Sequence, residues 1–139
     1  MQSPSASKGR ILCTEDDPDS RALLVILLEH RGYDVTVTAS AAHALAIAKR
    51  ERFDLLLVDN WMPGLSGQQL TREVRKFDKT TPILFYSGAA YETDKTEARD
   101  AGAQGYLVKP SDLETLLDEV GRLIAEAKIA FPLASVATK

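Results

Sequence analysis

Residues 54–59 read DLLLVD, a run of four apolar residues that ends abruptly at an aspartate. A short apolar run of this kind is typical of a strand that is buried on both faces of a sheet. Three further stretches share the pattern, namely residues 11–16 (ILCTED), 82–88 (PILFYSG) and 105–110 (GYLVKP). Residues 33–38, in which valines alternate with polar residues, predict a fifth strand.

Helical signals separate the predicted strands. Helices are predicted over residues 18–31, 40–50, 66–77, 91–101 and 111–128. Two of them begin with a capping box, in which Ser66 pairs with Gln69 and Ser111 pairs with Glu114. Because parallel strands need crossover connections, this alternation of strand and helix predicts an α/β fold with a parallel sheet and helices on both faces.

The composition is that of one globular domain, with 139 residues of which 45% are hydrophobic and 27% charged. We expect a disordered leader over residues 1–8, one domain over residues 9–128, and a tail or the start of a linker over residues 129–139. The net charge of −3 argues against nucleic-acid binding as the main role, and no apolar run approaches the roughly 20 residues of a membrane span. The single cysteine, Cys13, cannot form an internal disulfide, which fits a reducing cytoplasm.

Polar side chains follow the predicted strands at the points where the strands end. Glu15 and Asp16 follow the first strand, Asp59 the third, Ser87 the fourth and Lys109 the fifth. The carboxyl ends of parallel strands meet at one edge of the sheet, where open α/β folds bind their ligands. Each residue alone has an ordinary interpretation as a helix cap, a turn residue or a solvated lysine. Their joint placement at four strand ends instead predicts one common site.

The residue types at these strand ends suit the transfer of a phosphoryl group to a carboxylate. Three carboxylates repel one another unless a cation binds or one of them takes up a proton. Oxygen ligands of this kind favour Mg²⁺, and a nearby lysine offsets the remaining negative charge. A metal ion, a cation and a nucleophilic aspartate are the groups that such a transfer needs.

The chain resembles the receiver domain of two-component response regulators, of the chemotaxis-regulator type. The resemblance covers residues 9–128 and rests on four motifs that occur in order with family-like spacing: ILCTEDD with Pro18 and Arg21, DLLLVDNWMPGLSG, PILFYSG and GAQGYLVKP. It implies a doubly wound sheet of five parallel strands with five helices, in the flavodoxin-like order 2-1-3-4-5. Residues 103–105 (AQG) lack the paired acids common in the DNA-binding subclass, so we expect a monomer or a weak dimer.

The resemblance also implies how the acidic residues act. Asp59 matches the phosphoacceptor of the family. Glu15 and Asp16 match the acidic pair that holds Mg²⁺, with Asp59 as a third carboxylate ligand. Trp61 occupies the position whose backbone carbonyl completes the metal ligands, and we expect its ring to lie near the surface.

Three other residues match positions that respond to the phosphoryl group. Lys109 matches the lysine that pairs with the phosphate, and its peptide bond to Pro110 is expected to be cis. Ser87 and Tyr106 match the two switch residues. The resemblance implies that the acyl phosphate attracts Ser87 and that Tyr106 then turns inward.

The expected function is therefore a phosphorylation-controlled signalling switch, and not an enzyme. A sensor histidine kinase or a histidine phosphotransfer protein would donate the phosphoryl group. An unidentified output partner would dock on the face of the fourth helix, fifth strand and fifth helix. We expect a cytoplasmic location and no direct contact with nucleic acid or membrane.

Two other classes of protein share this topology. A Mg²⁺-dependent phosphatase with an aspartyl nucleophile is the main alternative, but such enzymes place two acids separated by one residue after the first strand, whereas Glu15 and Asp16 are adjacent. A nucleotide- or flavin-binding module would need a phosphate loop rich in glycine or hydroxyl groups, and residues 15–20 contain no glycine.

Overall fold

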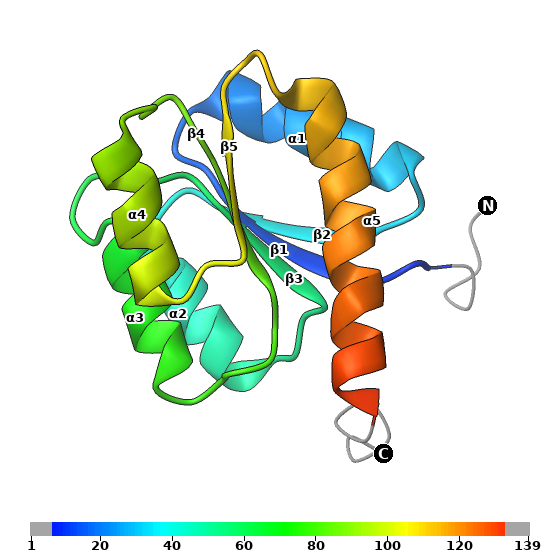
Figure 1. Ribbon diagram of the computed structural model, residues 1–139. Coiled ribbons are helices and arrows are strands. Elements are labelled where there is room, and N and C mark those ends of the chain that lie inside the picture. The colour runs from blue at the N-terminus through cyan, green and yellow to red at the C-terminus, as the bar shows by residue number, and fades with distance from the viewer. Residues whose placement is uncertain (1–6, 133–139) are drawn as a thin grey trace.

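The computed structural model describes residues 7–132 as alternating β-strands and α-helices (Figure 1). The strands are β1 (Arg10–Thr14), β2 (Asp34–Thr38), β3 (Leu55–Val58), β4 (Ile83–Ser87) and β5 (Gly105–Val108). The helices are α1 (Pro18–His30), α2 (Ala41–Arg50), α3 (Gly67–Arg75), α4 (Glu92–Ala101) and α5 (Leu113–Ala130). The strands pair in parallel in the order β2-β1-β3-β4-β5, which confirms the expected fold.

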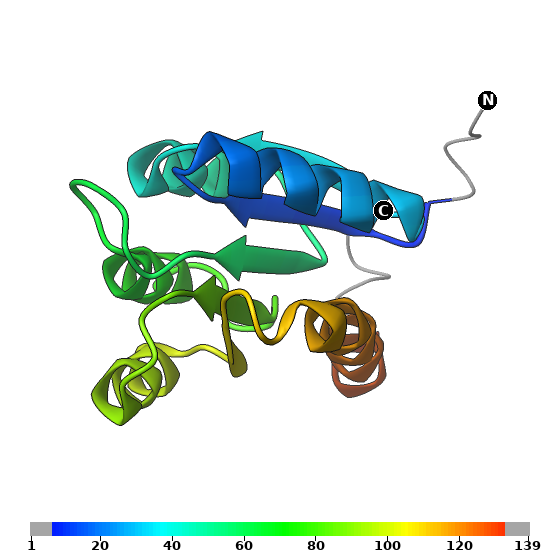
Figure 2. The same ribbon diagram turned by 90° about the horizontal axis from the view of Figure 1, so that it is seen from above.

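Helices cover both faces of the sheet (Figure 2): α1 and α5 lie on one face, and α2, α3 and α4 on the other. Because successive strand residues point to opposite faces, Ile11 and Cys13 pack with α1 and α5, while Leu12 packs with the other three helices. This burial on both sides explains why the strands are continuous apolar runs. Burial raises the pKa of Cys13 to about 12, in keeping with a small core residue.

The helix starts agree with the predicted capping signals in one case and differ in the other. The Ser66 hydroxyl accepts a hydrogen bond from the Gln69 N–H at 3.1 Å, and the Gln69 side chain accepts one from the Ser66 N–H at 2.8 Å, which confirms the first capping box. The box predicted at Ser111 is wrong, because Asp112 is the N-cap of α5. The Asp112 carboxylate accepts from the Val108 N–H at 2.8 Å and so secures the turn between β5 and α5.

The ends of the chain bear on the predicted domain limits. α5 continues to Ala130, two residues beyond the predicted limit at residue 128. Residues 1–6 and 133–139, which include most of the predicted leader and tail, lie outside the described residues. Within residues 7–132, no helix combines the length and the apolar character that crossing a membrane requires.

Candidate functional site

The sheet brings the predicted acidic residues to its carboxyl edge. β1 and β3 are neighbours, with Thr14 paired to Val58, so the residues that follow them, Glu15 and Asp59, come side by side. The Asp59 N–H donates to the Thr14 carbonyl at 3.1 Å and holds the two strand ends together. β4 and β5 continue the same parallel sheet, so their carboxyl ends lie at this edge too.

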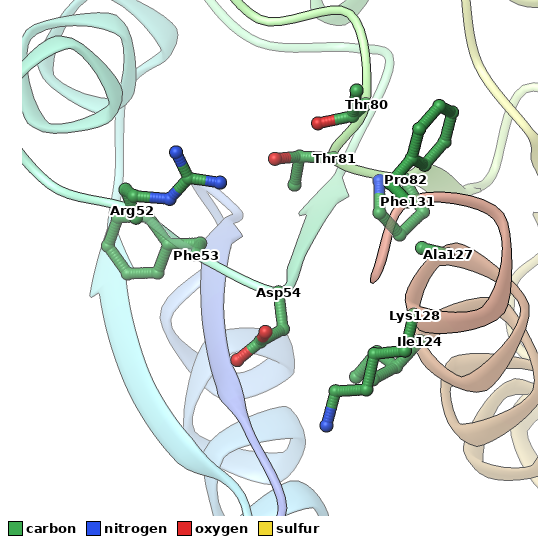
Figure 3. Close-up of a pocket in the computed structure, with 10 residues that line it drawn as sticks. All are labelled: Arg52, Phe53, Asp54, Thr80, Thr81, Pro82, Ile124, Ala127, Lys128 and Phe131. Carbon is green, nitrogen blue, oxygen red and sulfur yellow. The ribbon is translucent and has the colours of Figure 1, made fainter. Parts of the chain in front are cut away.

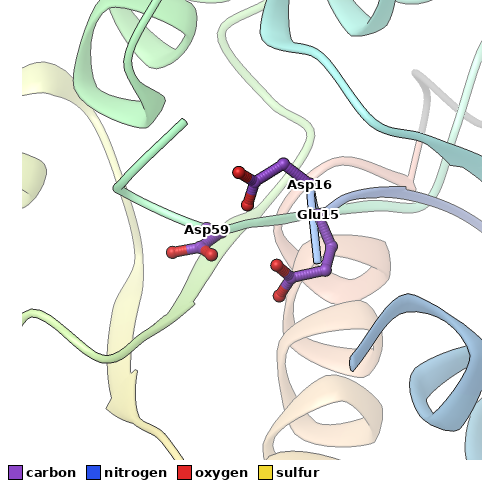
Figure 4. Close-up of side chains that lie close together, drawn as sticks. All are labelled: Glu15, Asp16 and Asp59. Carbon is purple, nitrogen blue, oxygen red and sulfur yellow. The ribbon is translucent and has the colours of Figure 1, made fainter. Parts of the chain in front are cut away.

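Three carboxylates form the centre of the site (Figure 4). Oxygens of Glu15, Asp16 and Asp59 lie within 4.8 Å of one another. Glu15 and Asp59 are only 1% and 7% exposed, whereas Asp16 is exposed. Negative charges gathered in a buried space are unfavourable unless cations or hydrogen-bond donors compensate them. Burial accordingly raises the pKa of Glu15.

Within residues 7–132, Lys109 is the cation that forms ion pairs with this cluster. Its ammonium group donates to Glu15 Oε1 and, at 3.0 Å, to Asp59 Oδ2. Burial alone would lower the pKa of Lys109, but the hydrogen bonds to the two carboxylates outweigh burial and raise it. Lys109 therefore stays protonated and links the ends of β1, β3 and β5. The peptide bond between Lys109 and Pro110 is cis, as expected.

Backbone donors from the two loops satisfy the remaining oxygens of the buried carboxylates. The Asp17 N–H donates to Glu15 Oε2 at 3.1 Å, and the Trp61 N–H donates to Asp59 Oδ1 at 3.2 Å. Each of these oxygens has a second lone pair, which leaves the cluster able to coordinate a cation. Trp61 is 64% exposed, which confirms its expected surface position.

Arg21 contributes to the site in a way that its motif alone did not reveal. Its Nη1 donates to the carbonyl of Glu15 at 2.9 Å and to the carbonyl of Asp16 at 3.2 Å. Side chains on a helix lean toward its N-terminus, so an arginine just after the start of α1 reaches back over the preceding loop. Arg21 thus holds the backbone that carries both acids.

A chain of hydrogen bonds joins the two expected switch residues. Ser87 is fully buried at the end of β4, and its hydroxyl accepts from the Ala89 N–H at 3.2 Å. The Ala89 carbonyl in turn accepts from the Tyr106 hydroxyl at 2.6 Å. The Tyr106 ring stacks on Phe85 with 5.5 Å between ring centroids. Tyr106 is therefore already directed toward the loop after Ser87, and an inward turn is not needed to make this contact.

The donor set fits a hard divalent cation. When the three carboxylates are ionised, the single ammonium of Lys109 leaves two negative charges uncompensated. Mg²⁺ carries two positive charges and prefers carboxylate and carbonyl oxygens. Both the charge and the ligand type of this cluster therefore agree with Mg²⁺.

A hollow at the opposite edge of the sheet is separate from this site (Figure 3). Its lining comes from the segments before β3 and β4 and from the end of α5, namely Arg52, Phe53, Asp54, Thr80, Thr81, Pro82, Ile124, Ala127, Lys128 and Phe131. Two of the segments that line the hollow precede β3 and β4, whereas the three carboxylates follow β1 and β3. The hollow and the carboxylate cluster therefore lie at opposite ends of the strands.

This chain matches a receiver-domain family model and several curated proteins. The family model of the response regulator receiver domain matches residues 11–121. The chain is 36% identical over 119 residues to protein PilH of Pseudomonas aeruginosa, and the match covers 84% of this chain and 98% of PilH. Several other curated relatives are longer, and the chain spans about half of their length.

Solved structures with the same architecture include two that contain magnesium. The receiver domain of a sensor histidine kinase from Pseudomonas aeruginosa, with a magnesium ion coordinated in its active-site cleft, has a TM-score of 0.78 at 32% identity and covers 84% of this chain and 98% of that one. Response regulator protein TrrA of Thermotoga maritima, in complex with Mg²⁺ and BeF, has a TM-score of 0.75 at 31% identity, covering 82% and 97%.

Proposed function

We propose that this chain, which belongs to the response regulator receiver domain family, accepts a phosphoryl group on Asp59 and changes its partner-binding face in response. Receiver domains are signalling domains and not enzymes in the usual sense. The observation that carries the proposal is the contact of Lys109 with both Glu15 and Asp59. It brings two carboxylates and a cation to one point, which supports Asp59 as the acceptor.

Glu15, Asp16 and Asp59, together with the backbone carbonyl of Trp61, are the groups that would hold Mg²⁺. The spacing of the three carboxylates, within 4.8 Å, supports this assignment. When bound, the metal ion supplies positive charge to the oxygens of the transferring phosphoryl group. The chain itself keeps the acids in place through the ammonium of Lys109 and the backbone donors of the two loops.

A histidine kinase or a histidine phosphotransfer protein would donate the phosphoryl group. A carboxylate oxygen of Asp59 attacks the phosphorus and forms a P–O bond, which creates an acyl phosphate. The P–N bond of the donor's phosphohistidine breaks, and its electron pair returns to the imidazole, which takes up a proton. The Lys109 ammonium, 3.0 Å from Asp59 Oδ2, then pairs with the new phosphoryl oxygens.

The switch would act through the hydrogen bonds that connect Ser87 to Tyr106. The hydroxyl of Ser87 can donate a hydrogen bond to the phosphoryl oxygens. This bond would draw the hydroxyl away from the Ala89 N–H, from which it accepts in the unmodified chain. Because the Ala89 carbonyl accepts from Tyr106, a movement of Ala89 reaches β5 and the start of α4. The output partner would therefore dock on the face of α4, β5 and α5.

Phosphorylation with acetyl phosphate and Mg²⁺ tests the acceptor. Intact mass spectrometry should show one alkali-labile phosphoryl group, as expected for an acyl phosphate, on the wild-type chain and none on Asp59→Asn. Asp19→Asn, which changes an exposed acid on α1, is the matched control and should be labelled like wild type. Labelling of Asp59→Asn to the wild-type level would show that the acceptor lies elsewhere.

A phosphorylated histidine protein tests the donor. Loss of the phosphoryl group from its histidine should coincide with labelling of the wild-type chain, and Asp59→Asn should leave the donor phosphorylated. Hydrolysis of small phosphate esters with repeated turnover would instead support the phosphatase alternative.

A further inference from the structure

α4 is attached to the domain mainly at its C-terminal end. Its buried residues, Ala98 and Ala101, both lie in its last four positions. None of the residues 92–97 is buried. Packing of an apolar face is what holds most helices in proteins, so residues 92–97 are held weakly, with an exposed hydrogen bond from Gln68 Nε2 of α3 to Glu97 Oε1 at 3.3 Å.

The carbonyl of Gly102, directly after α4, is the centre of a hydrogen-bond cluster. It accepts from Arg75 Nε at 3.1 Å, from Arg75 Nη2 at 3.0 Å and from Gln104 Nε2 at 3.1 Å. Gly102 has a φ of 121°, which favours glycine, and a Cβ at this position would lie 2.8 Å from Arg75 Cγ. Glycine therefore allows the arginine side chain to close over the end of the helix.

Arg75 and Gln104 extend this cluster to α3 and β4. Arg75 is the last residue of α3, and its Nη1 also donates to the Asp78 carbonyl at 3.0 Å. Gln104 Oε1 accepts from Arg75 Nη2 and from the Ile83 N–H, both at 2.8 Å. The end of α3, the start of β4 and the turn between α4 and β5 are thus joined at one point.

The N-terminal end of α4 is held differently. Its first turn is closed internally, with Asp94 Oδ2 accepting from the Tyr91 N–H at 3.2 Å, and the Tyr91 side chain is exposed. Ala89, in the loop before α4, is hydrogen-bonded to Ser87 and to Tyr106, the two residues of the proposed switch. The two ends of the helix therefore depend on separate sets of bonds.

We propose that Arg75 and Gln104 are positioning residues that make the C-terminal end of α4 a fixed pivot, so that phosphorylation moves only its N-terminal end. The movement rests on the function proposed above, whereas the pivot is a property of the unmodified chain. When α4 turns about its C-terminal end, the hollow between α4 and β5 widens only toward the N-terminal end of α4. That hollow is lined by Lys95, Ala98, Arg99, Ala103, Gln104, Gly105 and Tyr106.

Amide hydrogen exchange on the full chain tests the pivot without any ligand. The amides of Gly102 and Ala103 donate to the Ala98 carbonyl and report on the end of the helix. In Arg75→Met their exchange should rise about tenfold or more, because several charge-assisted hydrogen bonds are lost. Arg72→Met changes an exposed arginine on α3, the helix that ends at Arg75. In this variant the exchange of Gly102 and Ala103 should stay within about twofold of wild type.

Beryllofluoride with Mg²⁺, as a phosphoryl mimic, tests the movement. In the wild-type chain exchange should change over residues 89–95 and stay constant over residues 101–104. In Arg75→Met the change in exchange should extend over both residues 89–95 and residues 101–104. In Arg75→Lys the change over residues 101–104 should be smaller than in Arg75→Met but not absent, because one ammonium can replace only one of the bonds to Gly102.

Two results would overturn the pivot: unchanged exchange of Gly102 and Ala103 in Arg75→Met, or an equal response to beryllofluoride at both ends of α4 in wild type. If Arg75→Met does not fold, Gln104→Ala carries the same test, since it removes one donor to Gly102 and one acceptor from Arg75. A rise in Arg75→Met together with no beryllofluoride response would support the anchor and overturn the movement of α4, whereas the acceptor role of Asp59 is decided separately by the acetyl phosphate labelling.

Discussion

Replacement of Lys109 by methionine would remove the ammonium group that joins Glu15 to Asp59 and keep a side chain of similar length. The lysine side chain is 19% exposed, and the side chains of Glu15 and Asp59 are 2% and 9% exposed. The variant therefore leaves two nearly buried carboxylates close together without the cation that they share. We expect the free energy of unfolding to fall as a result.

The size of this loss follows from the burial of the three groups. Removal of one partner from a buried ion pair costs about 3–5 kcal/mol. Because Lys109 is partly exposed and Glu15, whose pKa burial raises, can take up a proton, we expect the lower end, about 3 kcal/mol near neutral pH. For a domain of this size the corresponding decrease in Tm is about 10 °C.

The loss should also depend on pH through Glu15. Burial raises the pKa of Glu15 above its ordinary 4.5, and the hydrogen bond from Lys109 opposes that rise. Without Lys109 the pKa of Glu15 is higher still. A group whose pKa is raised by folding contributes stability below its unfolded pKa and loses it as the pH rises through its folded pKa. The variant should therefore approach wild type in acid and fall behind it as the pH rises.

Urea unfolding without divalent cations, at about pH 5 and about pH 7, measures both effects. Lys95→Met is the matched control: Lys95 forms an ion pair with the largely exposed Glu92 at 3.4 Å, so its loss should cost less than about 1 kcal/mol. If Lys109→Met is as stable as wild type at neutral pH, or if its loss is the same at both pH values, the reasoning about buried charge is wrong.

Titration with Mg²⁺ should change the fluorescence of Trp61 with saturation, and Asp16→Ala should weaken that response; a spectrum indifferent to millimolar Mg²⁺ would place the metal site elsewhere. Gly67→Ala should cost about 1–3 kcal/mol in urea unfolding and slow acetyl phosphate labelling, because its Cβ would lie 2.6 Å from the Asp59 carbonyl; unchanged stability would contradict this. Burial acts to raise the pKa of Asp78, but hydrogen bonds from the following threonines lower it, so its contribution to stability is present above its unfolded pKa and lost as the pH falls through its folded pKa. Asp78→Asn should thus cost about 1 kcal/mol near neutral pH and weaken the acid dependence of urea unfolding, and an unaltered pH profile would argue against it.

The order of the elements could be predicted because its signals are local. The run from Leu55 to Val58 is apolar throughout since both of its neighbouring layers are helical, and such a run can be recognised without knowledge of those layers. The same reliance on local signals explains why the start of α5 was mispredicted. Ser111 and Asp112 both belong to residue types that favour N-caps, but the Asp112 carboxylate accepts from the Val108 N–H and makes no side-chain cap to α5.

The members of the site could be named from the sequence, but their contacts could not. Glu15, Asp16, Asp59 and Lys109 follow buried parallel strands, and the carboxyl ends of such strands meet at one edge. Which oxygen accepts from Lys109 depends on strand register and on side-chain rotamers, which no short stretch of sequence specifies. The role of Asp59 as phosphoacceptor stays a prediction until labelling tests it.

The sequence by itself determined the alternation of strand and helix and the set of charged groups at the strand ends, because apolar periodicity and residue order are properties of short segments. Only the tertiary structure decided that Arg21 holds the loop of the acidic pair, that Tyr106 already bonds to Ala89, and that Arg75 closes over Gly102. Arg75 and Gly102 are 27 positions apart, and Tyr106 and Ala89 are 17 apart. Hydrogen bonds over such separations require paired strands and packed helices, so they depend on the geometry of the whole sheet and leave no local pattern in the sequence.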